Sequence, residues 1–95
     1  MYMKYLDWSD EKNEKLQQER NISFEEVQLA IEDGRLLTIL QHHNLGRYAH
    51  QQIFVVTINS YIYLVPFVED EEKVFLKTII PSRKAAKDFL VQEGT

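Results

Sequence analysis

The chain has 95 residues, a formal net charge of −4 at neutral pH and no cysteine. This length predicts one domain, residues 1–95, with a modest core that needs neither disulfides nor metal. The acidic balance argues against general, non-specific binding to nucleic acid. The absence of cysteine excludes thiolate chemistry and suits a cytoplasmic location. Neither a signal peptide nor a membrane-spanning stretch is expected.

The N-terminal third predicts two helices. In residues 8–20, WSDEKNEKLQQER, Ser9 is the expected N-cap, and two acidic residues follow at the positive end of the helix dipole. In residues 21–34, NISFEEVQLAIEDG, Ser23 and Glu26 form a capping box ahead of apolar residues at helical spacing. A glycine is placed to end this second helix.

Strand-length apolar runs follow, at residues 36–40, 52–58, 61–68 and 73–80. A long polar loop, 41–51, separates the first two runs. Asn59 and Ser60 predict a two-residue hairpin between the second and third, since asparagine tolerates positive φ. Pro66 cannot donate a ladder hydrogen bond, so it indicates an edge, a bulge or a strand end.

A last helix is expected to begin near Ser82 and to pack the apolar side chains of Ala85, Ala86, Phe89 and Leu90. The elements together predict an α+β fold. It consists of two N-terminal helices, a mostly antiparallel sheet of about four strands and one C-terminal helix.

Alternation along two strands leaves the placement of aromatic side chains open. On one strand Ile62, Leu64 and Val68 alternate with Tyr61, Tyr63, Val65 and Phe67; on the next, Val74, Leu76 and Ile80 alternate with Phe75, Lys77 and Ile79. If the first set of each strand faces the helices, the other face presents aromatic rings beside a lysine, which suits single-stranded nucleic acid. Alternatively, helices cover both faces, or the tyrosines lie at the edge of an ordinary core.

Basic residues are concentrated near the C-terminus. From Lys73 to Lys87 there are five bases and no acid. Arg83 and Lys87 share one helix face, with Lys84 beside them. Cations at a helix N-terminus are disfavoured by ~0.3–1 kcal/mol each, but the same dipole favours a phosphate bound between them. An anion site and an ordinary solvated surface are the two interpretations.

Three histidines, His42, His43 and His50, lie in the polar loop together with Arg47. Without cysteine or an acidic ligand pattern beside them, a metal site is not favoured. A general acid or base and a solvated loop are the alternatives. No metal is expected. No cofactor is expected either, and the sequence has no glycine-rich phosphate loop.

Both ends of the chain resemble BrnT-type toxins. Trp8, Lys12 and residues 22–26, ISFEE, match the opening pattern of that family, and Ile79, Ile80, Arg83, Lys84 and Ala85 match its closing Ile-Ile-x-x-Arg-Lys-Ala segment. The resemblance implies a RelE-like α+β fold and RNA cleavage without metal. It also implies neutralisation by a small antitoxin that has a ribbon-helix-helix DNA-binding part.

On this resemblance we expect the toxin component of a bacterial type II toxin–antitoxin system, acting as an mRNA endoribonuclease. Arg83 is the expected transition-state stabiliser. Lys12 and Lys77 are further catalytic candidates, and His50, or His43 in its place, is the candidate general base. The expected RNA-binding residues are Lys84, Lys87, Tyr63 and Arg47.

The alternative function is a non-catalytic interaction module that keeps the toxin fold and binds a protein partner or nucleic acid. The net charge favours this alternative, as does the sequence Glu19-Arg20-Asn21 where the family has Lys-His-Gly. The Arg83–Lys84 pair at an unfavourable helix end favours the enzyme. The expected partners are the antitoxin and RNA, without a membrane, and a homo-oligomer is left open.

Overall fold

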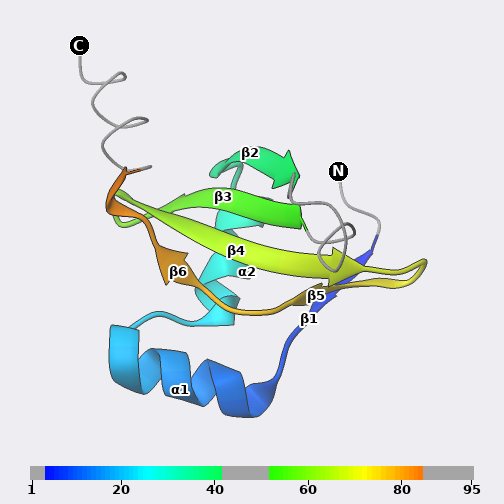
Figure 1. Ribbon diagram of the computed structural model, residues 1–95, viewed down its shortest axis with the longest axis horizontal. Helices are drawn as coiled ribbons and strands as arrows, with labels where there is room; N and C mark the ends of the chain where they lie inside the picture. The colour runs from blue at the N-terminus through cyan, green and yellow to red at the C-terminus, as the bar shows by residue number, and fades with distance from the viewer. Residues whose placement is uncertain (1–3, 42–51, 85–95) are drawn as a thin grey trace.

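The computed structural model describes residues 4–41 and 52–84. Within them lie two helices and six strands: β1 (Tyr5–Asp7), α1 (Asp10–Arg20), α2 (Phe24–Glu32), β2 (Leu36–Gln41), β3 (Gln52–Ile58), β4 (Tyr61–Glu69), β5 (Lys73–Leu76) and β6 (Ile80–Pro81). Figure 1 shows α2 across one face of the sheet and α1 below the β5–β6 side. The predicted α+β class is confirmed.

The sheet is larger than predicted and is mixed. Its strand order is β1-β5-β4-β3-β2, with β6 also paired to β4. Every pair is antiparallel except β1 with β5, where Tyr5 lies opposite Lys73. The prediction of about four strands was therefore wrong in number. It missed the three-residue β1 and treated residues 73–80 as one strand.

The interruption between β5 and β6 has a local cause in Pro66. This residue lies inside β4, and its carbonyl oxygen accepts from the Lys77 N–H at 2.8 Å. In a strand, the N–H and C=O groups of one residue point toward the same neighbouring strand. Pro66 therefore has no N–H to donate on the side that faces Lys77. Residues 77–79 leave the ladder at that point.

The predicted helix caps are confirmed. The Ser9 hydroxyl accepts from the Lys12 N–H at 3.3 Å at the start of α1. At α2, the Ser23 hydroxyl accepts from the Glu26 N–H at 3.3 Å, and the Glu26 carboxylate accepts from the Ser23 N–H at 2.9 Å. These two bonds form the capping box and satisfy backbone donors that the helix itself cannot pair. Asn21, with φ of 54°, ends α1 in the left-handed conformation.

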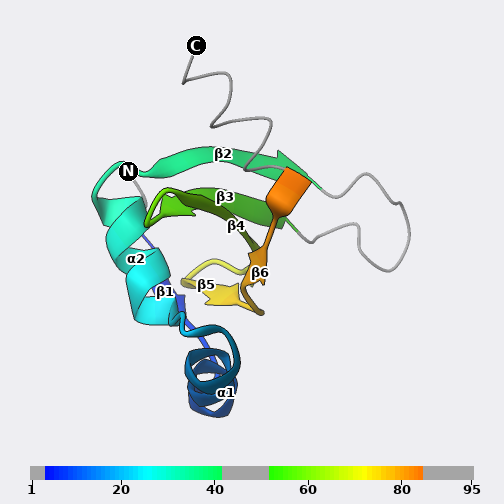
Figure 2. The same cartoon turned by 90° about the vertical axis from the view of Figure 1, so that its left-hand side faces the viewer.

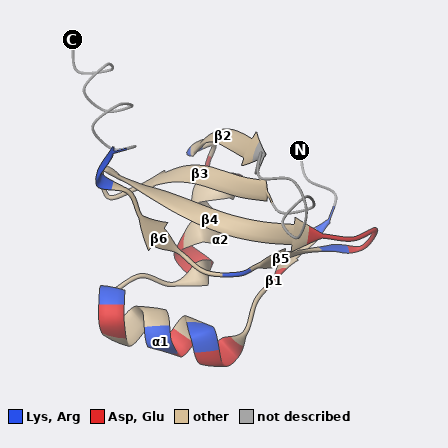
Figure 3. Ribbon diagram, in the orientation of Figure 1, with Lys and Arg blue, Asp and Glu red and all other residues tan. Residues whose placement is uncertain are grey.

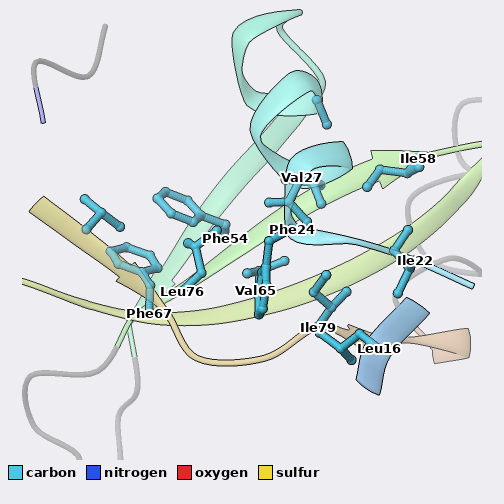
Figure 4. Close-up of a cluster of buried hydrophobic side chains, with 13 residues drawn as sticks. Leu16, Ile22, Phe24, Val27, Phe54, Ile58, Val65, Phe67, Leu76 and Ile79 are labelled. Carbon is cyan, nitrogen blue, oxygen red and sulfur yellow. The ribbon is translucent and has the colours of Figure 1, made fainter. Parts of the chain in front are cut away.

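The main core lies between the helices and one face of the sheet (Figure 4). The Phe54 and Phe67 rings stack in it with their centroids 3.9 Å apart. Leu16 of α1 lies beside Ile79 and so fastens that helix under the β5–β6 connection. A smaller cluster contains buried Val55 and Ile62, with Leu37, Tyr61 and Leu64 packed against them.

The sequence assigned one set of side chains on β4 and one on β5 to the face that meets the helices, and this assignment was correct for β5 only. Val74 and Leu76 of β5 belong to the main core, as expected. On β4 the assignment was reversed, because Val65 and Phe67 join that core while Ile62 belongs to the smaller cluster. Residues 61–68 are apolar or aromatic throughout, so alternation alone carried no signal there. The assumption of continuous alternation also failed beyond β5, where Ile79 is 1% exposed and Ile80 is 42% exposed.

The predicted hairpin between β3 and β4 is confirmed. Asn59 and Ser60 have φ of 53° and 63°, the positive values that a two-residue turn of type I′ requires. Arg83 and Lys84 are helical, in agreement with a helix start near Ser82. The rest of the predicted C-terminal helix, with Ala85, Ala86, Phe89 and Leu90, lies outside the described residues. So do residues 42–51 of the predicted polar loop 41–51, whose first residue, Gln41, belongs to β2 instead. In the described part, no helix is both long and apolar enough to cross a membrane.

Candidate functional site

Arg83 and Lys84 follow β6 after one residue, Ser82, which β4 holds in place. Pro81 pairs with Tyr63, and the Ser82 N–H donates to the Ile62 carbonyl at 3.0 Å. Both Arg83 and Lys84 are exposed. Figure 3 shows the two cations as a basic segment at the end of β6.

The ion pairs of the described chain leave this segment unneutralised. Three pairs are present: Lys4 with Glu69 at 3.1 Å, Arg35 with Asp33 at 3.3 Å and Lys73 with Asp7 at 3.3 Å. Within residues 4–41 and 52–84, no carboxylate pairs with Arg83 or Lys84. Both side chains are exposed cations, and the fork of Arg83 suits two oxygens of one phosphate.

Tyr63 lies in the strand that adjoins this basic segment. Its ring is half-buried against the main core and meets Tyr61 edge-on, with centroids 5.5 Å apart. Burial raises the pKa of the Tyr63 hydroxyl above its ordinary value, with smaller contributions from the Glu26 carboxylate and Tyr61. The hydroxyl therefore stays protonated at neutral pH and can donate a hydrogen bond. Tyr61 was not among the predicted site residues, although its spacing of two from Tyr63 was a usable signal.

Lys77 begins the β5–β6 connection that carries Ile79, and Lys12 lies on α1, the helix that packs against this connection. Lys12 is one helical turn before Leu16, on the same side of α1, and Leu16 packs in the core with Ile79. Lys12 is half-buried and Lys77 is exposed. Neither is in an ion pair with another described residue.

The backbone positions of two predicted cations, Lys77 and Arg83, differ along β4. The backbone of Lys77 bonds to β4 at Pro66, whereas that of Ser82 bonds at Ile62. Four strand residues correspond to roughly 13 Å at ~3.3 Å per residue. Lys77 and Ser82, the residue before Arg83, are thus attached at different levels of β4.

The remaining predicted site residues, Arg47, His50 and Lys87, lie outside the described residues, as does the alternative base His43. In the part of the chain that the structure describes, no three side chains of the metal-binding types are grouped as a site.

Comparison with known proteins decides the family. Residues 8–88 match the family of BrnT ribonuclease toxins of type II toxin–antitoxin systems. The chain belongs to this family. No curated protein and no solved structure matches it. The chain is therefore a ribonuclease toxin, with RNA as its substrate and an antitoxin protein as its partner.

The matched range of the toxin includes both segments that suggested the resemblance. Trp8 and Lys12 lie at its start, and Arg83 and Lys84 lie close to its end. The opening and closing segments meet in the core, where Leu16 lies beside Ile79.

Proposed function

We propose that the toxin cleaves mRNA internally, in the cytoplasm and without a metal ion. The ribose 2′-OH attacks the adjacent phosphate, which gives a cyclic phosphate and a 5′-OH end. This reaction needs a group that removes the 2′-OH proton, cations that stabilise the crowded phosphorane and a donor for the leaving oxygen.

Arg83 is the proposed transition-state stabiliser. The observation that carries this role is the exposed Arg83–Lys84 pair at the end of β6, which no described carboxylate neutralises. A guanidinium keeps its charge at every relevant pH and holds two phosphate oxygens at once. Lys84 and Lys87 hold the flanking phosphates.

The other cations contact the RNA further along β4. Lys77 is attached to β4 four residues from the level of Ser82, which precedes Arg83, so it binds a neighbouring phosphate of the same RNA strand. Lys12 binds the same phosphate from its position on α1. Tyr63 contacts the base next to the cleaved bond.

The polar loop supplies the remaining roles. Arg47 binds the RNA backbone, and His50, or His43 in its place, removes the 2′-OH proton. A neutral imidazole is the side chain suited to this step near pH 7.

The partner is a small antitoxin with a ribbon-helix-helix DNA-binding part, and the toxin fold is RelE-like. An acidic segment of the antitoxin pairs with the bases between Lys73 and Lys87 and occupies the place of RNA phosphates. Homo-oligomers of the toxin are compatible with this arrangement.

Cleavage is tested with purified toxin, an mRNA and excess EDTA, with and without ribosomes, followed by primer extension. Discrete new ends carrying a 5′-OH are expected. Intact RNA under both conditions would contradict the proposal, and retarded migration of uncleaved RNA would favour a non-catalytic binding module.

A further inference from the structure

A groove of about 1020 Å³ lies between β1, α2 and β2. Five of its nine lining residues are large and apolar: Tyr5, Leu6, Ile31, Leu36 and Ile39. The groove lies on the α2 side of the sheet. Figure 2 shows α2 on one side of the sheet and the segment after β6 on the other, so the groove is separate from Arg83 and Lys84.

Exposed apolar side chains of the described residues lie at this groove. Tyr5 is 58% exposed and Ile39 is 39% exposed, and both line the groove. They are two of the five large apolar side chains that are exposed in the described part. A concentrated apolar surface of this kind marks an interaction site more often than scattered apolar residues do.

The edge of the sheet next to the groove is formed by β2. β2 ends the strand order and, among the described strands, pairs only with β3. Its sequence, LLTILQ, has no charge and no proline, which are the usual features that keep an edge strand from pairing with another chain.

We propose that an extended, apolar segment of the antitoxin adds a strand to the free edge of β2 and places alternate side chains in the groove. Backbone hydrogen bonds to β2 hold such a segment, and the groove selects its apolar side chains. The inference rests on membership of a toxin family that has an antitoxin partner. It does not depend on the chemistry proposed for Arg83.

The shape of the surface favours a different chain over a second copy of the toxin. In a two-fold contact the same patch meets itself and must be self-complementary. A second copy would present the same exposed apolar residues, Tyr5 and Ile39, but these line the groove and do not project from the surface. Two hollows facing each other leave space unfilled, whereas an inserted strand fills one.

The test uses the small protein encoded by the gene next to this one as the probe. Its affinity for the purified toxin is measured by titration calorimetry for wild type, Ile39→Glu and Ile39→Thr. Ile39→Glu is expected to lose roughly tenfold or more in affinity, as central interface residues do. Ile39→Thr keeps a β-branched side chain and loses less. Leu29→Glu is the matched control, since Leu29 is 57% exposed and does not line the groove, and it should bind as wild type does.

Three further readouts complete the test. Backbone hydrogen exchange over Leu36–Gln41 should slow in the complex, and RNA cleavage by Ile39→Thr should equal that of wild type. Equal affinity of all variants, or unchanged exchange at β2, would overturn the inference. The inference would also be overturned if light scattering found a toxin dimer that Ile39→Glu dissociates while the affinity for the probe stays unchanged. Failure of wild-type toxin to cleave RNA would reject the proposed chemistry but not this docking site.

Discussion

Asn13 of α1 donates a hydrogen bond of 2.8 Å from its side-chain amide to the Glu25 carboxylate of α2. The carbonyl oxygen of the same side chain accepts from the Phe24 N–H, also at 2.8 Å. Asn13 is 6% exposed and is the only buried polar side chain among the described residues. One side chain thus satisfies a buried donor at the start of α2 and joins the two helices.

Replacement of Asn13 by leucine should destabilise the toxin by about 1–3 kcal/mol, because the buried Phe24 N–H loses its acceptor. Chemical denaturation of the purified variant measures this change. The control is Gln17→Leu, at an exposed position of the same helix, where a change within about 0.5 kcal/mol is expected. Equal midpoints for the two variants would show that the link does not stabilise the fold.

The same contact predicts a pH dependence. The hydrogen bond from Asn13 is the largest cause that lowers the pKa of Glu25 below its ordinary value of 4.5. Its stabilising effect is complete above the pKa of the unfolded chain and is lost as the pH falls below it. Glu25→Gln should therefore be less stable than wild type at pH 7, and the difference should shrink by pH 3. Denaturation midpoints at both pH values measure this, and a constant difference would rule out Glu25 as the source.

The capping box predicts a second, separate loss of stability. Ser23→Ala removes the acceptor of the Glu26 N–H and should cost about 1 kcal/mol. Thermal unfolding compares this variant with Ser60→Ala, which changes an exposed serine outside the helices. Superimposed curves for Ser23→Ala and wild type would mean that the cap contributes nothing.

Local signals made the helices and the hairpin predictable. The Ser23–Glu26 pair and the Asn59–Ser60 turn each act within four residues, so sequence spacing describes them fully. The parallel pairing of Tyr5 with Lys73 had no such signal, because β1 has only three residues and its partner is distant in sequence. The faces of β4 were ambiguous for another reason, since both its faces are apolar.

The candidate site was predictable to a similar extent. The position of Arg83 and Lys84 at a strand-to-helix junction followed from Pro81, Ser82 and the apolar run before them. Their separation from Lys77 did not, because it depends on the break in the ladder opposite Pro66. Tyr63 was identified from its strand, but its half-buried ring depends on the core formed by the helices.

Neutralisation by the antitoxin predicts that Lys84 is less exposed in the complex than in free toxin. If its acidic segment covers the bases between Lys73 and Lys87, Lys84 should react with an acetylating reagent several times more slowly in the complex than in free toxin. Lys15, exposed on α1, is the internal control and should react equally in both. A stable complex in which Lys84 keeps its full reactivity would exclude direct masking.

The central claim is that Arg83 stabilises the transition state of RNA cleavage, and Arg83→Ala tests it most directly. Cleavage should slow by roughly a hundredfold or more, while stability stays within about 0.5 kcal/mol because the side chain is exposed. Arg83→Lys should recover only part of the rate, since an ammonium lacks the two-pronged fork. Arg35→Ala is the charge-matched control and should cleave as wild type does. The account predicts a folded, inactive Arg83→Ala toxin; one that cleaves RNA at the wild-type rate would contradict it.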